Sequence, residues 1–447
     1  MNHWPRDAVF YHLYPLGSTG APERNDFASA PARRLADLHD WLPYLTDLGV
    51  NAIFLGPVLE SSAHGYDTAD FHRVDRRLGR NRDLKEFIAA CHARGLRVVL
   101  DAVFHHVGRD FWAFRDVRER GEASPYREWF HLDFAGRSPY GDPFSYRGWD
   151  GHFDLVKLDT SQREVRAHLL DAAEEWLTEF GADGLRLDAA DVLGHDFQRA
   201  LAHRCRDVKP GCWLLGEVVH GDYRNWAYPD GLDATTNYEL YKGLYSSHND
   251  RNYFEVAYAL NRQFGAGGIY QDLPLYTFAD NHDVPRIASV LRDPAHLYPL
   301  HVLLFTVPGV PALYYGSEWG VEGRKIPRSD APLRPALRPV ELQRAGEHPD
   351  LYGVVKSLVG LRHRLPALRY GDYSERLVTS EQFVFSRTYQ GETVLVAVNS
   401  SHEPVTVVVP DLQGSWLDLL GSDSFSSASS KLVLPLDPNW GRVLVRG

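Results

Sequence analysis

The chain has few cysteines, no long apolar run and no excess of positive charge. Its three cysteines, Cys91, Cys205 and Cys212, are irregularly spaced, which argues against a disulfide framework and against a zinc site. No run of about 18 apolar residues occurs, so no membrane span is expected. A formal net charge of −11 disfavours nucleic acid as a partner, because phosphate binding needs a basic surface. The N-terminus shows no signal-peptide pattern, so a cytoplasmic location is expected.

A unit of amphipathic helix, glycine and short apolar strand recurs along most of the chain. In one copy, leucines between Leu35 and Leu48 recur at helical spacing, Gly49 ends the helix, and an apolar strand follows at 51–55. This alternation implies parallel strands joined by right-handed crossovers. We expect strands at 9–14, 51–55, 96–100, 184–187, 212–217, 234–238, 275–278 and 311–315. Such a succession favours an α/β fold of the (β/α)8 TIM-barrel type over a doubly wound sheet.

Two segments interrupt this pattern. Residues 107–160 are rich in glycine, proline, aspartate and aromatics where a helix would otherwise stand, and a structureless loop of that length is uncommon. We expect them to form an inserted subdomain at the mouth of the barrel, whose own residues are 1–106 and 161–371. From 372 to 447, alternating apolar residues predict a C-terminal antiparallel β-sandwich.

Two carboxylates end neighbouring strands of the predicted barrel. Asp188 follows the fourth strand and Glu217 the fifth, and adjacent strands lie about 4.8 Å apart. That proximity suits a retaining glycosidase, whose two carboxyl groups are about 5–5.5 Å apart. Arg186 points to the same side as Asp188, so we expect its guanidinium to keep this carboxylate ionised as the nucleophile. Glu217 lies in an apolar strand and suits the general acid and then the general base.

Three further motifs bring polar residues to the same end of the barrel. They are Gly65-Tyr66-Asp67, Asp101-Ala-Val-Phe-His-His106 and Asn281-His282-Asp283. Taken singly, an aspartate at a strand end more often caps a helix or joins an ion pair, and the first motif is more often a turn. Their joint occurrence at one end of the strands is what predicts an active site. Neighbouring strand residues face opposite sides, so we expect His106 to point into the site and His105 to have a structural role.

Together these motifs resemble the α-amylase family of glycoside hydrolases (family 13). The segments 101–106, 184–188, 216–217 and 278–283 match the four signature regions of that family, and 309–318 matches its eighth-strand motif. The resemblance implies that Asp188 is the nucleophile, Glu217 the acid/base and Asp283 the transition-state stabiliser. It also implies substrate-binding and structural positions: Tyr66, Asp67, His106, Arg186, His282 and Arg286 for binding the sugar, and Asp101 for orienting the site from below.

Within that family, the chain resembles the cyclomaltodextrinase and neopullulanase group. Leu155-Val-Lys-Leu-Asp-Thr160 is similar to the Met-Pro-Lys-Leu-Asn motif of the group, and Trp226 is a candidate platform for a sugar beyond the cleavage point. The resemblance implies action on short or cyclic α-glucans inside cells. Residues 189–192 depart from the group at the acceptor side and suggest a special substrate such as cyclic maltosyl-maltose. His105 replaces a calcium-binding asparagine, so we expect no metal and no other cofactor.

Three functions remain open from the sequence. The first is a retaining hydrolase of α-1,4-glucosidic bonds in cyclic or short maltooligosaccharides. The second is a transglycosylase or isomerase of the same fold, and the third is a non-catalytic binding protein related to the family. The retained Asp188, Glu217 and Asp283 favour an enzyme with an oligosaccharide as its partner. A homodimer that closes the cleft with a neighbour's loop would suit cyclic substrates.

Overall fold

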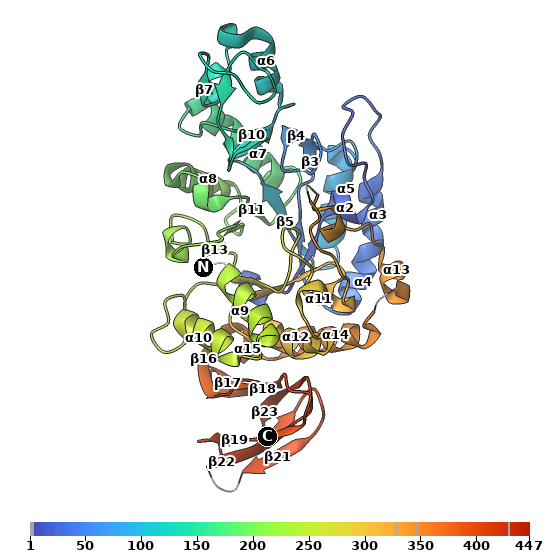
Figure 1. Ribbon diagram of the computed structural model, residues 1–447, viewed down its shortest axis with the longest axis vertical. Coiled ribbons are helices and arrows are strands. Elements are labelled where there is room, and N and C mark those ends of the chain that lie inside the picture. The colour runs from blue at the N-terminus through green and yellow to red at the C-terminus, as the bar shows by residue number, and fades with distance from the viewer. Residues whose placement is uncertain (1–3, 328, 346, 428–429) are drawn as a thin grey trace.

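The centre of the protein is an eight-stranded parallel sheet that closes into a barrel (Figure 1). The computed structural model describes residues 4–327, 329–345, 347–427 and 430–447. The strands are β1 (Phe10–Leu13), β2 (Ala52–Leu55), β5 (Arg97–Ala102), β11 (Gly184–Leu187), β12 (Trp213–Gly216), β13 (Ala234–Thr235), β14 (Tyr276–Phe278) and β15 (Val310–Tyr314). They pair in the order β13-β12-β11-β5-β2-β1-β15-β14, and a parallel bridge between Thr236 and Tyr276 joins the two ends. The predicted TIM barrel is therefore confirmed.

Helices surround this barrel and bury their apolar sides against it. The longer ones are α4 (Trp41–Leu48), α5 (Asn81–His92), α7 (Arg163–Thr178), α8 (His195–Val208), α9 (Tyr238–Asn249), α10 (Tyr253–Phe264), α12 (Leu297–Thr306) and α14 (Pro349–Arg364). Shorter ones are α1 (Trp4–Asp7), α2 (Pro15–Ser18), α3 (Arg34–Asp37), α11 (Ile287–Val290), α13 (Pro339–Ala345) and α15 (Pro366–Tyr370). Helix α4 ends where the sequence predicts, because Gly49 adopts the left-handed conformation with φ of 91°. None of the helices in the described part of the chain combines the length and apolar character needed to span a bilayer.

The segment after β5 projects from one end of the barrel, at the top of Figure 1. It begins with β6 (His106–Gly108) and contains α6 (Trp112–Arg120), β7 (Leu132–Asp133), β8 (Ser145–Tyr146), β9 (Gly148–Trp149) and β10 (His152–Lys157). Strand β10 pairs antiparallel with β6 and β9. Next to it, β3 (Leu59–Ser61) and β4 (Thr68–Val74) form an antiparallel pair. These elements surround the carboxyl ends of the barrel strands.

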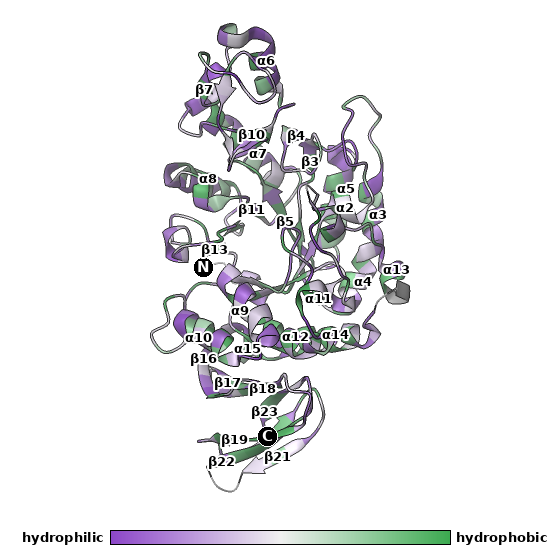
Figure 2. Ribbon diagram, viewed as in Figure 1, coloured by the Kyte–Doolittle hydropathy of each residue, from purple (hydrophilic) through white to green (hydrophobic). Residues whose placement is uncertain are grey.

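The C-terminal region is an antiparallel β-structure at the other end of the molecule (Figure 1). One sheet runs β16 (Asp372–Val378), β17 (Gln382–Tyr389), β18 (Glu392–Asn399), β23 (Trp440–Arg446), β20 (Gly414–Asp418) and β21 (Ser424–Ser427). The pair β19 (Val405–Pro410) and β22 (Lys431–Leu436) packs on it, and hydrophobic residues concentrate on these strands in Figure 2. Strand β18 is buried on both faces: Val394, Val396 and Val398 join the core of the barrel, and Leu395 and Ala397 join the core of the C-terminal domain.

Candidate active site

Strand register places Asp188 and Glu217 side by side. In the parallel pair β11–β12, Leu187 lies opposite Gly216, so the next residue of each strand is a carboxylate. The backbone beyond the strands continues this pairing, because the Glu217 amide donates to the Leu187 carbonyl at 2.9 Å. The amide of Ala189 donates to Glu217 Oε2 at 3.1 Å. The two carboxylates are thus held at neighbouring positions on one rim of the barrel.

One guanidinium joins three carboxylates at this rim. Arg186, on β11, is buried, and its Nη1 lies 2.8 Å from Asp101 Oδ1 and 3.0 Å from Asp188 Oδ1. Its Nη2 lies 2.8 Å from Glu217 Oε1. Because a guanidinium is planar and rigid, contacts on both of its terminal nitrogens fix Asp188 and Glu217 relative to each other.

The electrostatics of Asp188 differ from the sequence prediction. Burial raises its pKa most, Arg186 lowers it, and the like charges of Glu217 and Asp101 raise it again, so the pKa lies well above the ordinary value. Arg186 does not hold the pKa of Asp188 down as the sequence predicts, because burial of this carboxyl has the larger effect.

Asp283 enters the site from the opposite side, after β14. Its Oδ2 lies 2.8 Å from His282 Nε2, and its Oδ1 lies 3.1 Å from Nη2 of Arg334. Burial raises the pKa of Asp283, but His282 and then Arg334 more than offset this effect, so its pKa falls below the usual range. Asp283 is therefore an ionised carboxylate in the same site where the pKa of Asp188 is raised.

Two tyrosines contact the imidazole of His282, and the hydroxyl of Tyr66 is hydrogen-bonded to its Nε2. The ring of Tyr66 lies parallel to it with centroids 5.3 Å apart, and the ring of Tyr14 lies 5.5 Å from it at 22°. The hydroxyl of Tyr66 donates to Asp101 Oδ2 at 2.8 Å. Asp101 therefore links Arg186 on one side to Tyr66 on the other.

His106 reaches the site with a free ring nitrogen. Its Nε2 lies 3.9 Å from Asp188 Oδ2, is buried, and has no hydrogen-bond partner among the residues that the structure describes. Burial, followed by the neighbouring His105 and His64, lowers the pKa of His106 to about 3, so the ring is neutral at neutral pH. A neutral imidazole with an unused nitrogen beside a carboxylate can exchange a hydrogen bond with a sugar hydroxyl.

The other sequence-predicted residues lie further from the carboxylates. Asp67 is buried and accepts a hydrogen bond from the Gly65 amide at 3.2 Å. Trp226 is half-buried, with His195 as a ring neighbour at 6.5 Å. Neither side chain has a recorded contact with Asp188 or Glu217.

Arg286 is a correction to the predicted binding set. Its side chain is fully buried, and its Nη1 donates to the Tyr315 carbonyl at 2.8 Å. Its guanidinium lies 4.0 Å from the centre of the Tyr314 ring. These contacts hold the side chain in the protein interior at the carboxyl end of β15, so we assign Arg286 a structural position.

Two residues of the site escaped the sequence analysis. Arg334 follows a short 3-10 turn at Ala331–Leu333, and besides Asp283 it binds the His282 carbonyl through Nε at 3.1 Å. Tyr238 donates to Glu217 Oε1 at 3.3 Å and accepts from Asn281 Nδ2 at 3.2 Å. Tyr238 begins α9 and is the last residue of the predicted strand 234–238, so its strand-end position was the one available signal.

Comparison with known proteins finds a family match in both parts of the chain. Residues 32–349 match the α-amylase catalytic domain model, and residues 377–439 match that of the maltogenic amylase C-terminal domain. A cyclomaltodextrinase of Geobacillus thermopakistaniensis is 32% identical over 99% of this chain and 77% of its own length. Neopullulanase 2 of Thermoactinomyces vulgaris is 31% identical over 99% and 78%. The ligand-free cyclic α-maltosyl-(1→6)-maltose hydrolase of Arthrobacter globiformis superposes with a TM-score of 0.82, at 25% identity and with 99% of both chains covered.

The catalytic-domain match covers more than half of the chain and includes every carboxylate of the rim. The chain is a glycosidase and belongs to the α-amylase family of glycoside hydrolases.

Proposed function

We propose that the protein hydrolyses α-1,4-glucosidic bonds in cyclic or short maltooligosaccharides with retention of anomeric configuration. The observation that carries this proposal is the bridge of Arg186 between Asp188 and Glu217, which holds the two carboxylates at neighbouring strand ends. Retention requires such proximity, because the nucleophile must reach the anomeric carbon without an intervening water.

In this mechanism Asp188 attacks the anomeric carbon while Glu217 protonates the departing glycosidic oxygen. The bond from carbon to that oxygen breaks, and a covalent bond forms to Asp188. Glu217 then removes a proton from water, which attacks the same carbon and releases Asp188. Asp283, kept ionised by His282 and Arg334, stabilises the positive charge that develops on the sugar ring.

The remaining residues position the sugar. His106 offers its unused Nε2 to a hydroxyl next to Asp188, and Arg186 and His282 complete the polar wall. Tyr66 presents an aromatic ring at the same wall, 6.0 Å from the Arg186 guanidinium. Stacking of a tyrosine on the apolar face of a sugar would orient the ring for attack.

The choice of substrate follows the relatives. Their names describe action on cyclomaltodextrins and on cyclic maltosyl-maltose. We extend these activities to this chain as a proposal, and we place its work in the cytoplasm, in keeping with three free, buried cysteines.

Two measurements test the proposal. Proton NMR of the first product formed from maltotriose should show the α-anomer before mutarotation, and an initial β-anomer would refute retention. Initial rates on cyclodextrin, cyclic maltosyl-maltose, maltotriose, pullulan and starch should rank a small or cyclic substrate first. Starch cleaved faster than every small substrate would overturn the substrate assignment.

A transglycosylase is the second candidate. Val192 and Val219, which follow Asp188 and Glu217 closely in sequence, are 49% and 37% exposed. Exposed apolar side chains near the acid/base favour a sugar acceptor over water. Product analysis at high maltotriose concentration separates the two, since dominant transfer products with little reducing sugar would favour this candidate.

A further inference from the structure

A small cavity lies between the floor of the barrel and the C-terminal sheet. Its wall includes Arg6 and Gly309, which precede β1 and β15, and Arg369, Asp372 and Arg387 from α15, β16 and β17. The cavity therefore lies at the amino ends of the barrel strands, whereas Asp188 and Glu217 lie at the carboxyl ends. Its empty volume, open solvent included, is about 510 Å³, which leaves room for a small ion.

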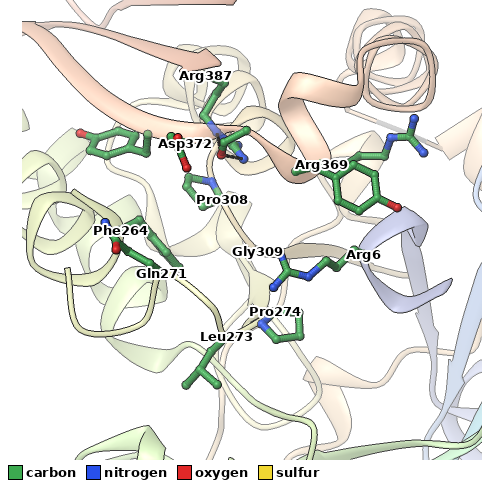
Figure 3. Close-up of a pocket in the computed structure, with 13 residues that line it drawn as sticks. Arg6, Phe264, Gln271, Leu273, Pro274, Pro308, Gly309, Arg369, Asp372 and Arg387 are labelled. Atoms are coloured by element: carbon green, nitrogen blue, oxygen red, sulfur yellow. Dashed lines mark hydrogen bonds between the residues drawn. The ribbon is translucent and has the colours of Figure 1, made fainter. Parts of the chain in front are cut away.

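Three arginines and one aspartate line this cavity. Arg369 is matched, because it forms an ion pair with Asp7, to which Tyr370 also donates a hydrogen bond at 2.6 Å. Figure 3 shows the Arg369 guanidinium directed away from the other two, while Arg6 reaches toward Gly309 and Arg387 approaches from the C-terminal sheet. The two remaining guanidinium groups are thus the ones that face the cavity.

Neither of these two has an ion-pair partner in the described part of the chain. Arg6 donates to the Asp272 carbonyl at 2.7 Å. Arg387 is 1% exposed and donates to the carbonyls of Gly371, at 2.9 Å, and Thr306, at 2.8 Å. Burial lowers the pKa of Arg387 to about 9, and repulsion from Arg6 adds to this effect against the opposing attraction of Asp372.

A fourth arginine adds to the positive charge behind the wall. Arg362 is fully buried, and its Nη1 donates to the Phe305 carbonyl at 3.0 Å, while its Nη2 donates to the carbonyl of Gly309. Burial and then Arg387 lower its pKa. Four arginines thus meet two aspartates, Asp7 and Asp372, in a protein whose overall charge is negative.

We propose that this cavity binds one small inorganic oxyanion of the size of phosphate, held between Arg6 and Arg387. Buried positive charge without a carboxylate partner is costly, and an anion that neutralises it stabilises the folded chain. Guanidinium groups match the geometry of tetrahedral oxyanions better than that of a halide, because each presents paired N–H donors. The anion would bridge the barrel and the C-terminal domain.

The test is binding of inorganic phosphate to the full chain, by isothermal titration calorimetry at constant ionic strength. We expect one site per chain and a Kd raised about tenfold by Arg6→Gln. Arg82→Gln is the matched control, because Arg82 is 67% exposed and lies on α5 away from the cavity. Asp372→Asn should lower the Kd severalfold, since it removes a negative charge from the wall. The kcat on maltotriose should stay unchanged in all three variants.

Thermal unfolding supplies a second readout for the same variants. Phosphate should raise Tm with the logarithm of its concentration in the parent, and this rise should shrink in Arg6→Gln alone. Absence of saturable binding would overturn the proposal. So would an equal rise in Tm with sodium chloride at the same ionic strength, or equal Kd values for Arg6→Gln and Arg82→Gln.

Discussion

The two ends of the barrel carry opposite imbalances of charge. At the carboxyl ends of the strands, Arg186 alone faces three carboxylates. At the amino ends, Arg362 and Arg387 are buried with backbone carbonyls as their partners. A carboxylic acid can take up a proton when its charge is unmatched, whereas an arginine holds its proton far more strongly. The active site can thus change its net charge by protonation. At the interface with the C-terminal domain, the buried arginines instead depend on carbonyl dipoles and on the proposed anion for their stabilisation.

The largest effect should come from removing a carboxylate of the pair. Asp188→Asn or Glu217→Gln should lower kcat by about 10⁴-fold or more, because members of one covalent mechanism fail as a unit. Circular dichroism should show an unchanged fold. Asp196→Asn, at a side chain that is 76% exposed, is the control and should keep its activity. Activity within tenfold of the parent in both variants would refute the assignment.

The shared guanidinium predicts opposite pH shifts for two substitutions. As the proposed nucleophile, Asp188 must be ionised to attack, so we expect its raised pKa to set the acid limb of kcat/KM. Asp101→Asn removes a like charge, which lowers this pKa and should move the limb to lower pH by about one unit. Arg186→Met removes the opposing charge and should move it to higher pH by a similar amount. The measurement is kcat/KM from pH 3 to 9, and shifts in the same direction would contradict the coupling.

At the interface between the barrel and the C-terminal domain, loss of a buried arginine should lower the stability of the fold and leave catalysis intact. Arg387→Met removes the donors to the carbonyls of Gly371 and Thr306, and should lower the free energy of unfolding by about 2–4 kcal/mol. Guanidinium chloride unfolding measures the change. The exposed Arg82→Met is expected to stay within about 0.5 kcal/mol of the parent. If Arg387→Met and Arg82→Met changed the free energy of unfolding equally, the buried donors of Arg387 would contribute nothing to stability.

A smaller effect should distinguish Arg334, which contacts Asp283 in the site, from Arg286, which is buried in the core. Arg334 contacts Asp283, so Arg334→Ala should raise KM about tenfold, near 1.4 kcal/mol, with little change in Tm. Arg286→Lys should lower Tm and leave KM almost unchanged, because Arg286 is buried and contacts the Tyr315 carbonyl, the Ser317 hydroxyl and the Tyr314 ring. A KM increase for Arg286→Lys that matches the one for Arg334→Ala would reinstate Arg286 as a binding residue.

The barrel could be predicted from the sequence because each strand is a short apolar run that ends at a glycine or a polar residue. Asp188 and Glu217 could be paired for the same reason, since consecutive strands place their ends together. The contact of Arg186 with three carboxylates could not be predicted from the sequence. It depends on the register of β5, β11 and β12 together, and no local sequence pattern determines that register.

Residues outside the periodic units were missed or misplaced. Arg334 lies in a stretch without helical or strand periodicity, so only tertiary structure brings it to Asp283. The resemblance implied a sugar-binding position for Arg286. The residue directly precedes α11, and its buried side chain contacts the Tyr315 carbonyl and the Tyr314 ring.

Strand β18 has a consequence for any shortened version of the chain. Its alternate side chains belong to two separate cores, with Val396 on the barrel side and Leu395 on the other. Truncation at Gly371 would leave the flank of α12 bare, since that helix packs on β18 and β23. Newly uncovered apolar surface of this kind promotes aggregation. The glycosidase barrel should therefore be insoluble when expressed without its C-terminal strands.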